Sequence, residues 1–164
     1  MNQSEIVKNL TKWMTEFIEV PNPKLGDWAP CPFARQARVN NNISIKFAEV
    51  SGLTYAVRES VELLTSKEVV VICFNHNNIN PVELQEYVEG MNKTLMAENY
   101  VILEDHPWTP EYINGVCMNF GHCGLLVIQK LDKLNNASYQ LREKGYYNSW
   151  TKEDLDSVVS WRYK

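Results

Sequence analysis

An uninterrupted apolar run, VVVICF at residues 69–74, limits the architectures open to this chain. The run has the length of a β-strand and is too short for an ordinary helix. Apolar side chains fall on both faces of its pleat, so both faces must be covered. We therefore expect residues 69–74 to form an inner strand of a sheet that is covered by helices.

Hydrophobic periodicity predicts the elements around this strand. Apolar and polar residues alternate in ISIKF, and two further short apolar runs precede helix-like patterns. Strands are expected from this at residues 43–47, 100–103 and 125–128, the later two antiparallel. Apolar residues at helical spacing predict helices at residues 4–20, 54–64, 80–96, 132–145 and 151–161, with a short helical turn at 32–38.

The order of these elements predicts the fold class. Helices that alternate with the early strands allow parallel pairing through right-handed crossovers. We expect an α/β fold, with α+β as the alternative. It would be one domain over residues 1–164, with a single mixed sheet of about four to five strands covered by helices.

Capping residues define where several helices begin. Asn80, Pro81 and Glu83 have the pattern of a capping box, in which a side-chain amide and a carboxylate satisfy free backbone N–H groups. The other expected N-caps are Ser4, Asp132 and Thr151. Between the last two strands, residues 104–123 (EDHPWTPEYINGVCMNFGHC) form the most irregular part of the chain.

Charge and processing signals exclude several classes of protein. Lys and Arg number 16 and Asp and Glu 20, a net charge of -4, so non-specific nucleic-acid binding is not expected. The N-terminus lacks a signal-peptide pattern, and no apolar stretch is long enough for a membrane span. Four cysteines are few for a disulfide framework, which predicts reduced thiols and a cytoplasmic protein. GxGxxG and P-loop motifs are absent from the sequence.

The segment GDWAPCPFARQAR carries the most suggestive chemistry. If Pro32 opens a helix, Cys31 lies at its N-cap, where free N–H groups favour a thiolate. Arg35 and Arg38 would then bind an anionic small molecule, with Trp28 as an apolar wall. The alternative is that Cys31 is a small buried apolar residue and that both arginines are solvated.

A second cluster follows the strand expected at residues 100–103. His106 is a candidate general base for Cys31, with Asp105 or Glu104 orienting it, and Trp108 is a candidate substrate contact. The end of a strand is where α/β proteins often place such groups. The alternative is that His106 is a structural residue in a turn set by Pro107.

A metal site is a third possibility. Weak candidate ligands are His76, Cys117, His122 and Cys123, with Cys31 or His106 completing the set. The spacing of these residues does not match an established zinc motif, and the sequence specifies no particular cofactor.

Three motifs together resemble a family of bacterial proteins without an assigned activity. They are Thr11-Lys12-Trp13 in the first helix, Cys31-Pro32-Phe33-Ala34, and His106-Pro107 after a strand. The resemblance implies that Cys31 and His106 belong to the same construction. The Asn-rich chain is also similar in style to phage-encoded proteins.

We therefore expect a small cytosolic protein with one of three functions. The first is a thiol-dependent enzyme that uses Cys31, with an Arg-lined site for an anionic small molecule. The alternative is a non-catalytic protein that binds a host protein or a small ligand, and the third is a metal-dependent enzyme using His76, His106 and His122. The C-terminal aromatic residues would pack on the core or, alternatively, form a partner surface.

Overall fold

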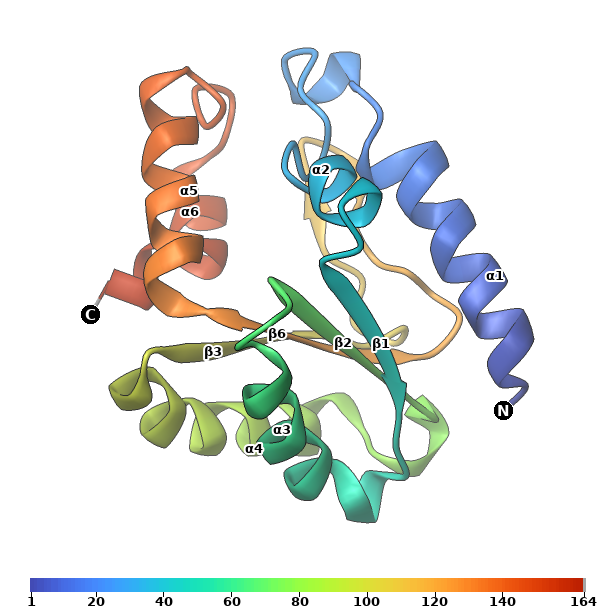
Figure 1. The fold of residues 1–164 in the computed structure, drawn as a ribbon. Helices are drawn as coiled ribbons and strands as arrows, with labels where there is room; N and C mark the ends of the chain where they lie inside the picture. Colours follow the sequence, from blue (N-terminus) through green and yellow to red (C-terminus); the bar gives the residue numbers. More distant parts are fainter. Residues whose placement is uncertain (164) are drawn as a thin grey trace.

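A mixed four-stranded sheet organises the protein, whose computed structural model describes residues 1–163 (Figure 1). Its strands lie in the order β1-β2-β6-β3, and β2 pairs with β1 in parallel. β6 runs antiparallel to both of its neighbours. The strands are β1 (Ile43–Phe47), β2 (Val69–Phe74), β6 (Gly124–Lys130) and β3 (Tyr100–Asp105). The expected single mixed sheet is confirmed, and the fold is α+β.

The inner strand β2 is covered on both faces, as its apolar run predicts. Val70, Ile72 and Phe74 pack against the helices α3 (Leu53–Leu63) and α4 (Pro81–Leu95). Val71 and Cys73 face α1 (Gln3–Trp13) on the other side. Figure 1 shows α3 and α4 together on one side of the sheet and α1 on the other.

Close packing between β2 and β6 depends on a glycine. Phe74 pairs directly with Gly124 across the two strands. A Cβ atom at position 124 would lie 2.3 Å from the Phe74 ring. The fully buried ring therefore fills the space above the glycine, and a larger residue there must displace it.

Helix starts follow the predicted caps in two cases and differ in two. Asn80 and Glu83 form the capping box of α4, and Thr151 caps α6 (Lys152–Val158). α1 is capped by Asn2 rather than Ser4. The helix α5 (Leu131–Glu143) begins one residue before Asp132, whose N–H instead bonds Asn99 Oδ1, supplied by the turn before β3. A cap from a distant segment leaves no local sequence pattern.

The first helix changes geometry before it ends. Its α-helical part ends at Trp13, and the chain continues as a π-helical turn, η1 (Met14–Ile18). The helical segment thus ends within two residues of the predicted position, residue 20. The remaining short helical segments are η2 (Pro23–Leu25), α2 (Ala34–Val39), η3 (Val50–Gly52), η4 (His76–Asn78), η5 (Met96–Glu98) and η6 (Ser160–Tyr163).

The segment expected to be irregular contains a small hairpin. β4 (Tyr112–Ile113) pairs with β5 (Val116–Cys117) through Asn114 and Gly115, which both have positive φ. Asn-Gly is the typical sequence of a two-residue hairpin turn, and this signal was present in the sequence. Ile113 and Val116 pack with Leu25 in a small core of their own.

The C-terminal aromatic residues mostly contact one another and the N-terminal loop. The rings of Tyr146, Tyr147 and Trp150 lie within 5.8 Å of each other, and Trp28 meets Tyr146 edge-on at 5.6 Å. This agrees with packing on the protein's own core. Within residues 1–163, no helix has the length and apolar character needed to cross a bilayer.

Candidate functional site

Sheet topology separates the two sequence-predicted catalytic residues. β1, β2 and β3 run in the same direction, so His106, just after β3, lies at their carboxyl edge. Cys31 precedes α2, which leads into the amino end of β1 (Figure 1). The residues around Cys31 are Ile18, Glu19, Phe33 and Ala34, whereas His106 bonds Ile79 and Trp108. The two residues therefore have no neighbour in common. The predicted Cys31–His106 pair is therefore not formed.

Cys31 is not the N-cap that the sequence predicts, because the N-cap of α2 is Phe33 and Cys31 lies in the turn before it. The backbone N–H groups of Phe33 and Ala34 point at the sulfur, and α2 itself begins at Ala34. The side chain is exposed to solvent, yet surrounding protein raises the pKa of the thiol by desolvation. Glu19 raises this pKa further, so Cys31 is a neutral thiol near neutral pH.

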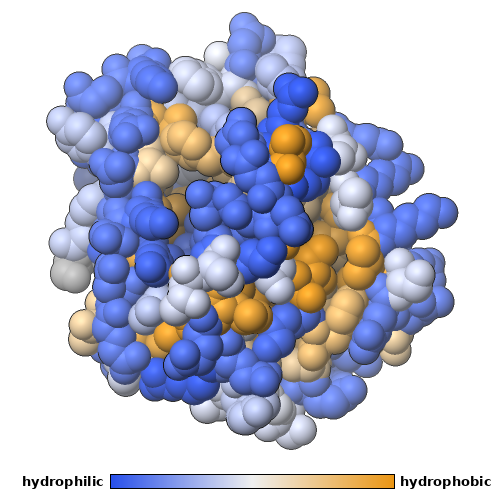
Figure 2. All heavy atoms as spheres, in the orientation of Figure 1, coloured by the Kyte–Doolittle hydropathy of each residue, from blue (hydrophilic) through white to orange (hydrophobic). Residues whose placement is uncertain are grey.

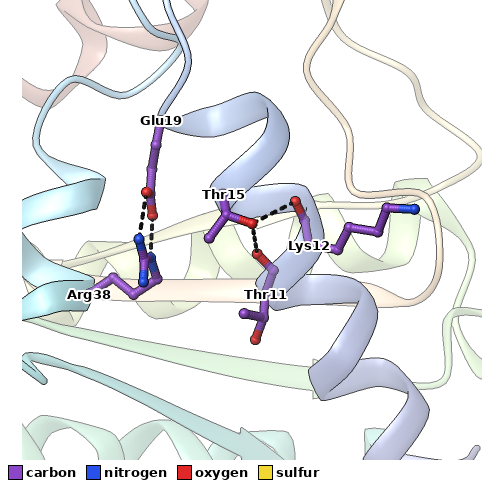
Figure 3. A network of polar contacts seen from close by, with 5 residues as sticks. All are labelled: Thr11, Lys12, Thr15, Glu19 and Arg38. Atoms are coloured by element: carbon purple, nitrogen blue, oxygen red, sulfur yellow. Dashed lines mark hydrogen bonds and ion pairs between the residues drawn. The ribbon is translucent and has the colours of Figure 1, made fainter.

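One of the two arginines expected to bind an anion is already paired. Arg38 donates from Nε and an Nη atom to the two carboxylate oxygens of Glu19, at 2.6 and 2.9 Å (Figure 3). Glu19 is held by the π-helical end of the first helix, and its side chain is only 5% exposed. Arg35 is exposed and makes no ion pair within residues 1–163. Arg38 is not free to hold a substrate.

Trp28 lies near Cys31, while Trp108 does not. Tyr146, which meets the Trp28 ring, donates its hydroxyl to Pro30 O at 2.6 Å. The space-filling view is hollowed between α5 and the α2 segment (Figure 2). Trp108 instead meets the rings of His76 and His106 at the carboxyl edge. Trp28, the predicted apolar wall, and Trp108, the predicted substrate contact, therefore lie in different places.

His106 has a structural role in this fold. Its Nδ1 accepts from Trp108 N–H at 3.1 Å, so Nε2 carries the proton and donates to Ile79 O at 2.9 Å. Both ring nitrogens are used, and the residue is 4% exposed. No lone pair remains for a general base. The alternative reading, a histidine in a turn, describes this geometry.

Asp105 holds the following loop rather than His106. Its carboxylate accepts from Asn119 Nδ2 at 3.0 Å and from Phe120 N–H at 2.9 Å. Partial burial raises the pKa of Asp105, and these two hydrogen bonds oppose that rise. The carboxylate therefore fixes residues 119–120 beneath the hairpin.

The candidate metal ligands are dispersed. His76 and His106 meet edge-on, with 5.8 Å between their ring centroids, but His122 lies against Phe120 instead. Cys117 is exposed on β5, while Cys123 is buried against Cys73. In the part of the chain that the structure describes, no three His, Cys, Asp or Glu side chains converge as ligands.

A large groove, which the sequence did not predict, runs along the outer side of β3. It lies between α4 on one side and the loop after β3, α6 and η6 on the other, with a volume of about 1320 Å³. Four of its lining residues are the carboxylates Glu89, Glu104, Asp105 and Glu111. Apolar surface comes from Val82, Met96, Met118 and Trp161. We call this feature the β3 groove.

Desolvation and, secondly, neighbouring carboxylates raise the pKa values of two glutamates in the β3 groove. Partial desolvation and the neighbouring Glu89 raise the pKa of Glu104 to about 7. Desolvation, Asp105 and Asp154 raise the pKa of Glu111. Glu89, Glu104 and Glu111 form no ion pair among residues 1–163. The groove lining also contains a basic side chain, Lys93. The groove lining therefore carries more acidic than basic groups, and its net charge is negative.

Asn92 covers the backbone at the centre of β3. Its Oδ1 accepts from Ile102 N–H at 2.9 Å and its Nδ2 donates to Ile102 O at 3.0 Å. The backbone of Ile102 thus points away from β6. Because strand residues alternate, Glu104 N–H and C=O also point outward into the groove. No hydrogen bond in the described chain reaches them.

Comparison with protein-family models, with curated proteins and with solved structures finds no match to this chain.

Proposed function

We propose that this protein is a non-catalytic binding protein whose β3 groove takes a basic peptide segment of a partner. The observation that carries the proposal is the groove itself, which presents Glu89, Glu104 and Glu111 to solvent without a cationic partner in residues 1–163. Desolvation is the main reason that the pKa of Glu104 is raised, and repulsion from Glu89 adds to it. Lysine or arginine side chains would relieve that repulsion and stabilise the ionised carboxylates.

The size and edge of the groove favour a peptide over a small molecule. Pockets for small ligands usually measure about 300–1,000 Å³, and this groove is larger. Glu104 N–H and C=O are available to an extended backbone, as in recognition by strand addition. Asn92 occupies the next such position, so pairing would be confined to a short stretch beside Glu104. Met96 and Trp161 offer apolar contacts to the stems of long cationic side chains.

Binding of labelled peptides tests the proposal. A Lys/Arg-rich peptide is expected to bind in fluorescence anisotropy more tightly than a peptide of the same length with Glu in place of each cation. Glu104→Gln is expected to weaken binding about five-fold, the effect of one charge pair of about 1 kcal/mol. Added salt should weaken it too.

Glu62→Gln is the matched control, because Glu62 is exposed on α3, outside the groove, and forms no ion pair within residues 1–163. It should leave the affinity unchanged. Equal binding of basic and acidic peptides, or equal loss in the Glu62 and Glu104 variants, would contradict the proposal. Binding of a small polyamine with the same dependence on Glu104 would support the β3 groove as the binding site but contradict a peptide as its ligand.

A thiol-dependent enzyme is the second candidate function. It is favoured by the exposure of Cys31 and by the Phe33 and Ala34 N–H groups directed at its sulfur. The raised pKa of the thiol and the pairing of Arg38 with Glu19 weigh against it. A Cys31 that iodoacetamide modifies readily at pH 7, compared with Cys31→Ser, would restore this candidate.

A further inference from the structure

The other edge of the sheet, β1, has an unpaired backbone. Asn42 O accepts from Val69 N–H, and Ala48 N–H donates to Cys73 O, so the even-numbered residues of β1 bond β2. The odd-numbered residues therefore point their N–H and C=O groups away from the sheet. No hydrogen bond in residues 1–163 reaches the backbone of these outward residues, Ile43, Ile45 and Phe47.

The side chains around this edge are largely apolar. Ile43, Ile45 and Phe47 lie on the α1 side and are only partly buried. Figure 2 shows apolar surface on the side of the molecule where β1 faces the viewer in Figure 1. On the α3 side, Lys46 binds Glu59 at 2.8 Å. An exposed apolar edge strand is a template for pairing with another strand.

We infer that β1 is a homodimer interface, in which β1 of a second copy pairs with it in antiparallel orientation. The two-fold axis would pass between Ile45 and Ile45 of the second copy. The outward groups then match as hydrogen-bonded pairs, with Ile43 opposite Phe47 in each direction. The result is one continuous sheet through both copies, with both α1 helices on the same side.

The choice of a second copy follows from self-complementarity. In this register Lys46 lies opposite Ser44 of the second copy, so its cation meets a neutral hydroxyl rather than another lysine. Ile43 lies opposite Phe47, an aromatic pair with a β-branched residue that stabilises antiparallel sheets. Donors and acceptors also match without a change of backbone. Five residues of β1 thus carry both halves of the interface.

Two substitutions at Ser44 test this register through charge. Ser44→Lys would place two lysines opposite each other at both symmetric positions, and Ser44→Glu would place a carboxylate opposite Lys46. Sedimentation equilibrium of the full chain, from about 10 μM to about 1 mM, should show a species of twice the 19.0 kDa chain mass. We expect Ser44→Lys to weaken dimerisation about ten-fold and Ser44→Glu to strengthen it several-fold.

Each outcome decides the question. A monomer over the whole range, for the native chain and for Ser44→Glu, overturns the interface. A dimer with the same affinity in both variants also overturns it, because the copies then meet elsewhere. Far-ultraviolet circular dichroism of each variant confirms that the fold persists. A lysine-weakened and glutamate-strengthened dimer supports both the interface and its register.

Discussion

The two edges of the sheet are built in opposite ways. At β3, the side chain of Asn92 satisfies Ile102 on both N–H and C=O, and negative charge surrounds the strand. At β1, no hydrogen bond within residues 1–163 covers the outward backbone, and the flanking side chains are mainly apolar. Both strands end the same sheet, so sheet formation alone does not explain the difference.

This contrast indicates that the edges serve different partners. The Asn92 amide occupies the backbone of Ile102 and so limits strand pairing along β3 to a short stretch beside Glu104. The acidic groove around that stretch favours a cationic segment. An uncovered apolar edge favours a strand with the same properties. The fold thus keeps one edge for charge and leaves the other for backbone pairing, and the following experiments test this division.

The largest effect is expected from proline in β1, where position determines the cost. Ser44→Pro removes an N–H that pairs with β2 and should lower the free energy of unfolding by about 3 kcal/mol or more. Ile45→Pro removes only an outward N–H, so beyond the packing loss shown by Ile45→Ala it should cost under about 1 kcal/mol. Urea unfolding of the three variants measures this, and equal costs for the two prolines would show that Ile45 N–H is already paired.

Removing the Asn92 amide should have the next largest effect. Asn92 is 6% exposed, and Asn92→Leu leaves Ile102 N–H and C=O without partners, at a cost of about 2 kcal/mol. Urea unfolding again reports the loss, and amide exchange at Ile102 should become faster. Asn136→Leu, at an exposed position on α5, is the control and should be near neutral. An unchanged exchange rate at Ile102 would show that Asn92 does not protect the edge.

Gly124→Ala tests the strand pair that lies between the two edges. The new methyl group would overlap the Phe74 ring, and relief of the overlap should cost about 1–3 kcal/mol. Thermal unfolding measures the loss, and Gly90→Ala on α4, where a Cβ meets open space, should be neutral or stabilising. If both alanines behave alike, the close packing of Phe74 is not what requires a glycine.

Glu104 should make the β3 edge sensitive to pH. Its pKa is raised from 4.5 to about 7 in the folded protein, so ionisation there costs stability as pH rises from about 4.5 to 7. Glu104→Gln should therefore stabilise the fold at pH 8, by roughly 1 kcal/mol after solvent screening, and have no effect at pH 4. Melting temperatures at both pH values measure this. A stabilisation that is the same at pH 4 would rule out ionisation as its cause.

The smallest predicted change is in the reactivity of Cys31. Because desolvation and Glu19 raise the pKa of this thiol above 9.0, alkylation by iodoacetamide should be slow at pH 7. Glu19→Gln removes one of the two causes and should increase the rate at Cys31, but not at the exposed Cys117. Site-resolved mass spectrometry gives both rates. An alkylation rate at Cys31 that is the same in Glu19→Gln would show that the Glu19 carboxylate does not raise the pKa of this thiol.

Local patterns predicted most of the elements of this fold. The apolar run at 69–74, the capping box at Asn80 and the cap at Thr151 act over a few residues, and each is present as expected. The Asn114-Gly115 hairpin also follows a local rule, although its two-residue strands are too short to give an alternating pattern within the irregular segment 104–123.

Tertiary structure alone decided how the candidate site residues are grouped. Cys31 and His106 both had suitable local surroundings, but the strand directions place His106 at the carboxyl ends of β1, β2 and β3, whereas Cys31 lies before α2, which leads into the amino end of β1. Glu19, Ile79 and Asn92 each bond a residue at least 10 positions away in the sequence. No local spacing of residues therefore predicts these contacts. Hydrogen-bond capping and hydrophobic periodicity are short-range and therefore legible in the sequence. The charge, the burial and the unpaired hydrogen-bonding groups of a site depend on contacts that exist only once the sheet has formed.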